Sequence, residues 1–447
     1  MHYLLALFFF ILYTGDNLGL NISLGPGMSV KNLILYLIFA GIAINSAVAR
    51  NRKIEIPGVV VPFGLLIVYA LVTWFVLSFI LMNPDYGVRE SFIRLKSSEV
   101  DQLLMLLVFF YGTIHEKDTY WLLRAVLWIV MLGNVITLVD ALDIPNLGIV
   151  EAKVRNDRFL GFLGSANGYG QFLVLFLPAC VALYLNCRGK ARLLAGIGLF
   201  STAISLVLTG SRGAYVGLLA GSFLAAIFLR KTIPTKTIIR AGIASMFLCA
   251  VVVVAALVTD YGNVVSDSMG KFEGSTHVAT SGRSTIWGNA LAAMVEYPVT
   301  FLTGFGFNAY ESAGRFYAAT HNTYLNYLYN LGSIGVLLFL LPFAGILATA
   351  RSALESAHEE WKSQFFAMVF GLLAFLVSIF FGEYHQSTYM LWAYLGIVMR
   401  MVMQVRDRAE PAIGEYGTRS ASQMLPDGRP GYVDTGLDNP TWAKREM

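Results

Sequence analysis

Arg212 is the first residue whose position suggests chemistry, because it lies between two apolar segments in the sequence Thr209-Gly-Ser-Arg-Gly213. An arginine inside a bilayer costs about 3 kcal/mol on insertion scales unless it reaches water or an anion. The flanking glycines allow a tight turn and close approach of the backbone. We therefore predict that Arg212 contacts an anion, with a hairpin arginine that only reaches water as the alternative.

Arg283 and His321 are two further candidates. Arg283 adjoins a helix predicted over about 284–296, and solvation or ion pairing is its simpler explanation. His321 begins the sequence His-Asn-Thr-Tyr-Leu-Asn at the start of a predicted helix, where the helix dipole disfavours imidazolium. A general base must be unprotonated, although a histidine in this place can also cap the helix. Glu383 and His385, in a later loop, are rivals for the role of base.

The elements that must position these residues are apolar helices. Of the 447 residues, 56% are hydrophobic and 13% are charged, and the mean hydropathy is +0.63. Soluble domains carry about 25% charged residues, whereas segments of about twenty apolar residues match the ~30 Å core of a bilayer. We predict an all-α polytopic membrane protein with about 12 transmembrane helices. The predicted spans are 2–20, 30–49, 58–82, 98–115, 119–141, 166–186, 191–209, 213–229, 238–258, 322–349, 363–381 and 388–405.

Charge asymmetry between the loops predicts the orientation. Basic residues cluster after the second, sixth and eighth spans, whereas residues 14–29 and 382–388 on the opposite side contain no lysine or arginine. The positive-inside rule makes the basic side cytoplasmic, so both termini are predicted to be cytoplasmic. The clusters are Arg50, Arg52 and Lys53; Arg188, Lys190 and Arg192; and Arg230, Lys231, Lys236 and Arg240.

Three segments predicted to face outward nevertheless carry basic residues. Acidic residues accompany each group, so ordinary loop charge explains them as well as an anion site does. An anion site would exploit the arginine fork, which can grip a phosphate with two hydrogen bonds. The groups are Arg89, Arg94 and Lys96; Lys153, Arg155 and Arg158; and Lys271, Arg283 and Arg315.

The predicted domain organisation is a membrane domain followed by a tail. Residues 1–405 form the membrane domain, and they include a long outward loop over about 259–321. Loops of this length are often functional. Residues 87–96 are predicted to form an amphipathic segment on the membrane surface, and residues 406–447 a disordered cytoplasmic tail. The first apolar stretch lacks a basic start and a cleavage pattern, which predicts a retained span.

Several classes of function are disfavoured by the composition. The net charge of +4 is small and scattered, which disfavours nucleic acid as a partner. No cysteine–histidine cluster has zinc spacing, and no glycine-rich nucleotide loop is present. The three cysteines lie in or beside apolar spans, so no disulfide framework is expected. The sequence predicts neither a metal ion nor another cofactor.

Five short motifs occur in an order that resembles the O-antigen ligase and Wzy-type polysaccharide polymerase family. They extend over about 155–340, and the long outward loop fits the same family. The resemblance implies a GT-C-like glycosyltransferase of the bacterial inner membrane that inverts the anomeric carbon without a metal. The motifs are Arg158-Phe-Leu-Gly161 with Asn167, Gly-Ser-Arg212-Gly, Gly-Arg283 with Trp287, Gly304-x-Gly306, and His321-Asn322 leading into Gly332.

The resemblance also implies roles for the candidate residues and their partners. A glycan on undecaprenyl diphosphate would be the donor at the periplasmic face, with Arg212 and Arg283 binding the diphosphate. His321 would take the proton of the acceptor hydroxyl. Membrane lipids are expected partners, and the family allows a chain-length regulator as another. The implied substrate-binding residues are Arg158, Ser211, Asn322 and Tyr324.

Two reactions and a second class of protein are left open. The enzyme would either polymerise O-antigen or exopolysaccharide repeat units or transfer glycan to lipid A–core. Some ligases carry a second histidine two positions before the conserved one, where this chain has Ala319, and this favours a polymerase. A secondary transporter or flippase is the alternative class. A six-plus-six transporter would have a long central loop, but the loop after the sixth span covers only about 187–191.

Overall fold

The structure is a computed structural model in which almost all described residues are helical. Two antiparallel strands, β1 (Ser23–Gly25) and β2 (Met28–Ser29), form a small hairpin after α1 (His2–Thr14). The predicted span at 238–258 lies outside the described residues. The structure describes residues 1–48, 56–141, 158–230, 282–312, 316, 319–382 and 388–422.

Eight helices in the described part of the chain are long and apolar enough to cross a membrane. An all-α polytopic membrane protein is therefore confirmed, while the count of twelve and the GT-C-like fold stay predictions. Helix α1 is apolar but shorter than the predicted first span. The eight are Val30–Val48, Val60–Ile80, Glu116–Asp140, Ala166–Asn186, Gly189–Leu208, Arg212–Leu229, Thr323–Ala353 and Glu359–Phe381.

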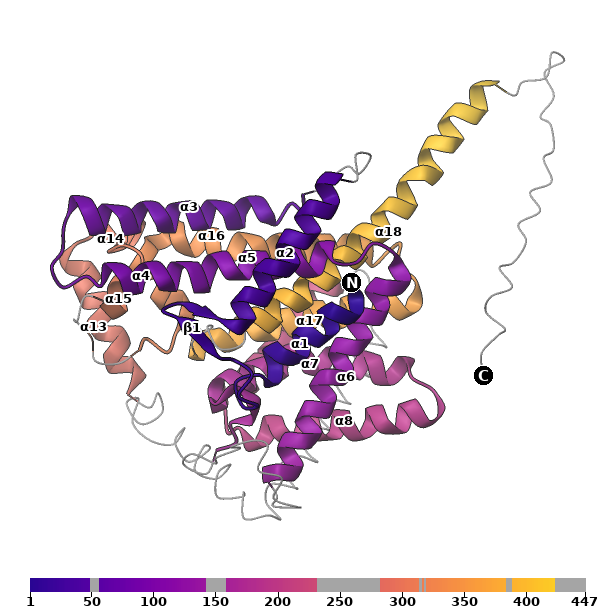
Figure 1. Ribbon diagram of the computed structural model, residues 1–447, viewed down its shortest axis with the longest axis horizontal. Coiled ribbons are helices and arrows are strands. Elements are labelled where there is room, and N and C mark those ends of the chain that lie inside the picture. The colour runs from indigo at the N-terminus through magenta and orange to yellow at the C-terminus, as the bar shows by residue number, and fades with distance from the viewer. Residues whose placement is uncertain are drawn as a thin grey trace.

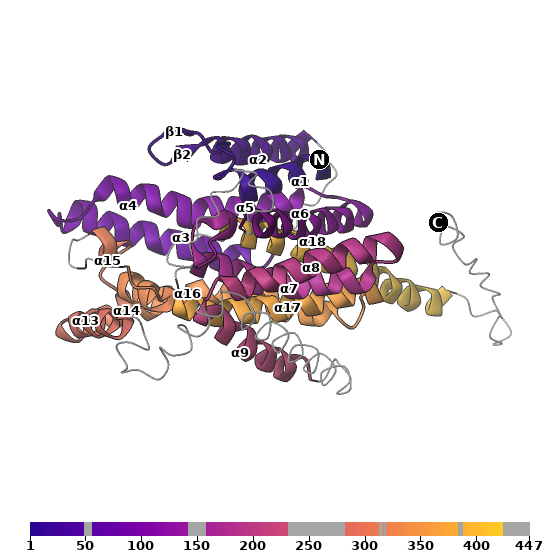
Figure 2. The ribbon, with the colours of Figure 1, turned by 90° about the horizontal axis from the view of Figure 1, so that it is seen from below.

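The centre of the bundle is α7 (Ala166–Asn186), which is buried along most of its length. It packs against α8 (Gly189–Leu208), α9 (Arg212–Leu229) and α17 (Glu359–Ser378). Figure 2 shows α8, α7 and α17 running side by side. A helix that is apolar all round is expected at such a place, and α7 thus holds the other three helices in register.

Glycine spacing explains why α9 lies so close to α17. Gly213, Gly217 and Gly221 recur every four residues and so share one face of α9. A Cβ atom at Gly213 would come 2.6 Å from the Phe381 Cβ, and one at Gly217 would come 2.6 Å from the Ala374 carbonyl oxygen. The small-residue face predicted for close packing is confirmed, and the start of α9 is fixed by it.

The predicted amphipathic segment at 87–96 is helical and continues without a break into the fourth predicted span; its place at the membrane surface stays a prediction. Two of its polar side chains also meet protein partners. Arg94 pairs with Glu311 and Lys96 pairs with Asp101. The continuous helix consists of α4 (Val88–Leu95), the π-helical turn η2 (Lys96–Val100) and α5 (Asp101–Tyr111).

Helix α16 (Thr323–Ala353) is broken at Gly332, where φ is 66° and ψ is −169°. A break of this kind leaves helix carbonyls without their intrahelical donors. The amides of residues 305 and 306 supply the donors, each 2.8 Å from a carbonyl oxygen, those of Tyr329 and Asn330 respectively. The long predicted loop is thereby fastened to the middle of a spanning helix.

Gly304 and Gly332 are the two positions that permit this joint. Both have positive φ, 74° and 66°. A Cβ atom at Gly304 would overlap the Asn330 carbonyl, and one at Gly332 would overlap the carbonyl of Leu302, at the end of α14 (Thr300–Thr303). Only glycine combines this backbone conformation with so close an approach, which explains two of the motifs found in the sequence.

The described part of the long loop forms short helices at one end of the molecule. The helix predicted at 284–296 is confirmed as α13 (Arg283–Glu296), and α15 (Ala309–Ser312) lies near α4. Figure 1 shows α4, α13, α14 and α15 together, opposite the end at which α18 projects. The described part of this loop is thus a helical cap on one end of the bundle.

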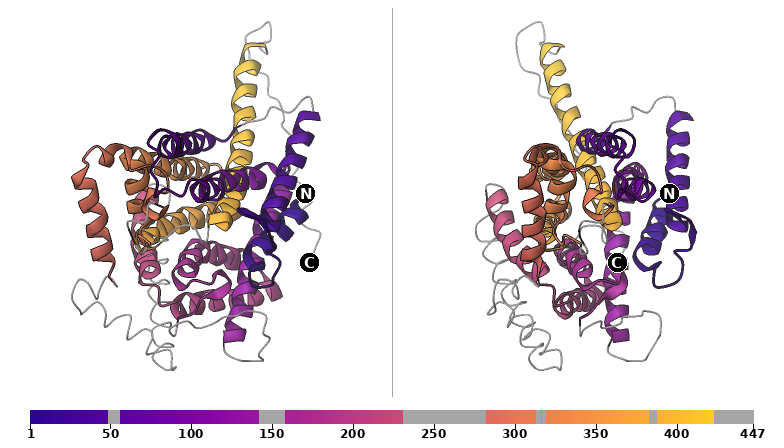
Figure 3. Two further views of the ribbon diagram at one scale, coloured as in Figure 1. Left: turned by 60° about the vertical axis from the view of Figure 1, so that its left-hand side comes forward. Right: turned by 90° about the vertical axis from the view of Figure 1, so that its left-hand side faces the viewer.

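Helix α18 (Thr388–Ser422) continues past residue 405, where the membrane domain was predicted to end. Residues 406–422 are therefore helical, although disorder was predicted there, and 423–447 lie outside the described residues. Figure 3 shows this helix projecting from the bundle. Extending an existing helix adds one hydrogen bond for each residue and needs no new nucleus, so a polar continuation can remain helical.

Candidate active site

The starts of α9 and α16 meet where α17 ends, at η4 (Ile379–Phe381) and Gly382. The Thr323 hydroxyl, two residues after the predicted base, donates to the Gly382 carbonyl at 3.0 Å. Gly213, which follows the first predicted arginine, packs against the end of η4. The structure therefore brings these two candidates to the same short segment of the chain.

Helix α13 brings Arg283 to the same place through Trp287. The indole Nε1 of Trp287 donates to the Thr320 carbonyl at 2.9 Å, directly before the predicted base. Its ring also lies edge-on to Phe380, with 5.5 Å between centroids. Arg283 precedes Trp287 by four residues and so shares its side of the helix. All three predicted catalytic residues thus belong to helix starts that contact residues 380–382.

Arg158 lies beside the turn that precedes α9. Its Nε donates to the Thr209 carbonyl at 2.8 Å, and its Nη2 donates to Asn167 Oδ1 at 2.8 Å. Burial lowers the pKa of Arg158 from its usual value, and the positive charge of Arg212 acts in the same direction. Two guanidinium groups that disfavour each other's charge are stabilised by an anion placed between them.

His321 has a backbone φ of 48°, in the left-handed region that few residues other than glycine adopt. The N-cap of α16 is Asn322, whose Oδ1 accepts from the Leu325 amide at 3.1 Å. The alternative in which His321 caps the helix is therefore wrong, since its neighbour performs that task. Strained backbone of this kind concentrates at functional sites.

Three residues predicted to bind substrate have structural contacts. Asn322 caps α16, and the Tyr324 hydroxyl donates to the Leu376 carbonyl at 2.6 Å, which ties α16 to α17. Ser211 is 2% exposed, and its Oγ lies 3.4 Å from Asn167 Oδ1. These contacts position the site; direct contact of the three with substrate stays a prediction.

Two members of the first basic group predicted to face outward are paired with carboxylates. Arg94 and Lys96 form the ion pairs with Glu311 and Asp101 described above, so neither points to an anion. Within the described ranges, no group of three or more His, Cys, Asp or Glu residues is placed to hold a metal ion. Several predicted candidates lie outside the described residues: Lys153, Arg155, Lys271, Arg315, Glu383 and His385.

Sequence reasoning missed residues 380–382, which the starts of α9, α13 and α16 contact. It also missed the side chain of Gln171, which lies beside Gly382. Phe380, Phe381 and Gly382 read as the end of an apolar span, with nothing to mark them as a meeting point. Gln171 is 2% exposed, and its Oε1 has no hydrogen-bond partner among the described residues. Gln171 follows Asn167 by four residues, so the two side chains lie on the same face of the helix. Two amide side chains at this spacing in an apolar span were the signal that the sequence offered.

Fold and site together define a multi-pass helical membrane protein with an arginine- and histidine-bearing site at one end of its bundle. Residues 197–340 match the family model described as O-antigen ligase (Wzy_C). Over these residues the chain is similar to the O-antigen ligase family, the family that its motifs resemble. The matched residues run from α8 into α16 and include Arg212, Arg283 and His321. No curated protein matches the chain.

Proposed function

We propose that this protein is a glycosyltransferase that moves a glycan from undecaprenyl diphosphate to an acceptor hydroxyl at the periplasmic face. The observation that carries the proposal is the placement of Arg158 at the turn that leads into Arg212: its Nε donates to the Thr209 carbonyl, three residues before Arg212, at the start of α9. A diphosphate leaving group carries negative charge that fixed cations stabilise as it departs. Arg283, on the helix docked against the same segment, adds a third cation.

His321 is the proposed general base. As the acceptor oxygen attacks the anomeric carbon, its proton passes to the imidazole. The bond between that carbon and the diphosphate oxygen breaks, and undecaprenyl diphosphate leaves with the electron pair. Attack opposite the leaving group inverts the anomeric carbon. The left-handed backbone at His321 and the separate cap at Asn322 support a side chain held for chemistry.

Polymerisation of repeat units is the favoured reaction, because Ala319 stands where some ligases have a second histidine. Ligation of glycan to lipid A–core is the other candidate. A deletion strain separates them: single repeat units on surface lipid A mean a lost polymerase. Glycan that accumulates on its carrier, with none on lipid A, means a lost ligase.

The decisive experiment is transfer in vitro by the purified protein, with a lipid-linked glycan as donor. The wild-type protein is expected to extend or transfer the glycan in the presence of EDTA, because the arginines supply the positive charge that a metal would. Loss of transfer in EDTA with rescue by magnesium contradicts metal independence. A cysteine at position 283 should react with a reagent added outside the cell; reaction only from the cytoplasm contradicts the proposed orientation.

A further inference from the structure

A cavity of about 910 Å³ lies apart from the arginine site. It is bordered by the chain before α4, by α4 and η2, by α15 and by the start of α18. Its volume falls in the range of about 300–1,000 Å³ that is typical of small-ligand sites. The polar side chains around it include those of Asp85, Glu90, Ser97, Gln102, Asn308 and Tyr389.

The charges around the cavity are opposite to those of the arginine site. Three carboxyl side chains line it, those of Asp85, Glu90 and Glu311, and the cation among the lining residues, Arg94, is paired with Glu311. This excess of negative charge disfavours a diphosphate or another anion. The carboxylates instead favour a ligand that is rich in hydrogen-bond donors and carries no negative charge.

Hydroxyl groups match the rest of the lining. Carboxylate oxygens only accept hydrogen bonds, whereas serine hydroxyls and side-chain amides both donate and accept. Ser97, Ser98, Gln102 and Asn308 supply these groups around the cavity. Tyr389 adds an apolar ring face with a polar edge, a combination that suits an amphipathic ligand. A saccharide offers hydroxyls of both kinds and apolar C–H faces.

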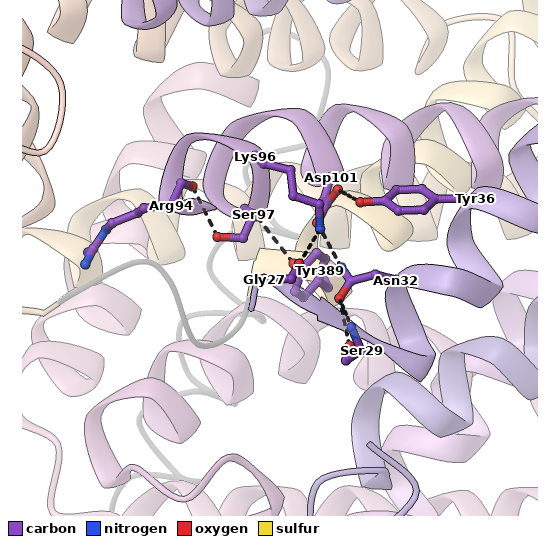
Figure 4. A network of polar contacts seen from close by, with 9 residues as sticks. All are labelled: Gly27, Ser29, Asn32, Tyr36, Arg94, Lys96, Ser97, Asp101 and Tyr389. Atoms are coloured by element: carbon purple, nitrogen blue, oxygen red, sulfur yellow. Dashed lines mark hydrogen bonds and ion pairs between the residues drawn. The ribbon is translucent and has the colours of Figure 1, made fainter. Parts of the chain in front are cut away.

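A buried polar network fixes the positions of the helices that line one side of the cavity, namely the helix of residues 88–111 and the start of α18 (Figure 4). Asp101 is fully buried and accepts from Lys96 at 2.9 Å, Asn32 at 2.8 Å and Tyr36 at 2.6 Å. The Tyr389 hydroxyl donates to the Ser97 carbonyl at 3.3 Å. Three segments that are far apart in the sequence, α2 (Val30–Val48), the helix of residues 88–111 and the start of α18, are thereby joined beside the cavity. A preformed wall lowers the entropic cost of binding.

Helix α16 links the cavity to the proposed base. The Tyr327 hydroxyl donates at 2.8 Å to Glu99, the buried neighbour of Ser98 in the cavity wall. Tyr327 lies four residues after Thr323, where α16 begins, which is about 6 Å along the helix axis, and His321 precedes Thr323 by two residues. A chain of a few sugars is long enough to cover such a distance.

We propose that this cavity binds the acceptor glycan, an uncharged and hydroxyl-rich saccharide chain, and delivers its terminal hydroxyl to His321. The inference rests on the proposed transferase function. The two sites then bind substrates of different charge: the arginine site binds the anionic donor, and the carboxylate-lined cavity binds the neutral acceptor. The saccharide belongs either to a growing lipid-linked glycan or to lipid A–core.

The kinetic test compares Glu90→Gln, which removes one carboxylate, and Ser97→Phe, which fills the cavity, with the wild-type protein. Each variant is expected to raise KM for the acceptor about tenfold: Glu90→Gln replaces a hydrogen bond to a charged group by a weaker neutral one, and Ser97→Phe occupies volume that the saccharide needs. KM for the donor and kcat at saturating acceptor should not change. Glu296→Gln is the matched control, because Glu296 is an exposed carboxylate on α13 outside the cavity.

A binding test separates failure of this inference from failure of the proposed function. Saturation-transfer NMR on purified full-length protein, without donor, uses lipid-free repeat-unit oligosaccharide and lipid-free, dephosphorylated core oligosaccharide. Binding of one of them that is lost in Ser97→Phe and kept in Arg212→Ala supports the cavity and identifies the acceptor. Equal binding by wild type and Ser97→Phe, or an unchanged acceptor KM in Glu90→Gln, overturns the inference. Full transfer by Arg212→Ala and His321→Ala would instead overturn the function.

Discussion

Arginines occur at both ends of the helical bundle, but their surroundings differ. At the site end, Arg158 is partly buried, bonded to a backbone carbonyl and an amide, and close to Arg212. At the other end, Arg192 is exposed over the Tyr184 ring at 5.0 Å, and Arg230 is exposed at the end of α9. Water and an aromatic ring face stabilise the charges of the exposed pair, Arg192 and Arg230. An anion would stabilise the charges of Arg158 and Arg212. The environment, more than the residue type, therefore distinguishes the arginines at the two ends.

The largest effect that would sharpen this comparison is expected for His321→Asn. Asparagine adopts the left-handed backbone of His321 as readily as histidine does, so the local fold should persist. It cannot act as a base, and loss of one acid–base group typically lowers the rate by about 10²–10⁴. Transfer should fall by this factor while donor binding remains. His358→Asn, at the N-cap of α17 on the other end, should retain full activity.

Arg212→Lys is expected to lower transfer by about 10²–10³, the loss seen when one donor to a developing oxyanion is removed. Lysine keeps the charge but lacks the planar fork that holds two phosphate oxygens. The same substitution at exposed Arg192 should change the rate less than twofold. Similar rates for the two variants would show that both arginines only reach water, and the contrast between the ends would disappear.

Gly332→Ala tests whether the site end depends on the joint between α16 and the outer loop. The added Cβ would overlap the Leu302 carbonyl at a positive φ, which should destabilise the protein by about 1–3 kcal/mol. Gly345→Ala in the other half of α16 meets no atom within 4 Å and should be neutral or stabilising. Thermal unfolding in detergent measures both. Equal midpoints would show that the joint does not contribute to stability.

Trp287→Phe should have the smallest effect at the site end. Phenylalanine keeps an aromatic ring against Phe380 but loses the hydrogen bond to the Thr320 carbonyl. One hydrogen bond of about 1 kcal/mol corresponds to a roughly fivefold fall in transfer. Trp121→Phe, on a 38% exposed tryptophan of α6 (Glu116–Ala141), is the control and should match the wild type. Equal rates of transfer by the two variants would show that α13 does not support the site.

The sequence predicted the membrane class, the family similarity over residues 197–340 and the residues that the structure gathers, because each depends on local composition or on a motif. The glycine face of α9 is such a case, since four-residue spacing is visible in the chain. Gln171 and Gly382 were missed because their importance arises from contacts between helices distant in sequence. The ion pair of Arg94 with Glu311 was missed for the same reason, since the two residues are 217 positions apart in the sequence.

The joint at Gly332 also constrains the order in which the protein can be made. Phe305 and Gly306 are synthesised before Tyr329 and Asn330. The amides of residues 305 and 306 therefore have no carbonyl partners until this part of α16 has been made. This segment therefore cannot dock before residues 329 and 330 have been synthesised. A nascent chain that stops before residue 329 would leave the segment undocked and open to proteases, and insertion of α16 would be the event that docks it.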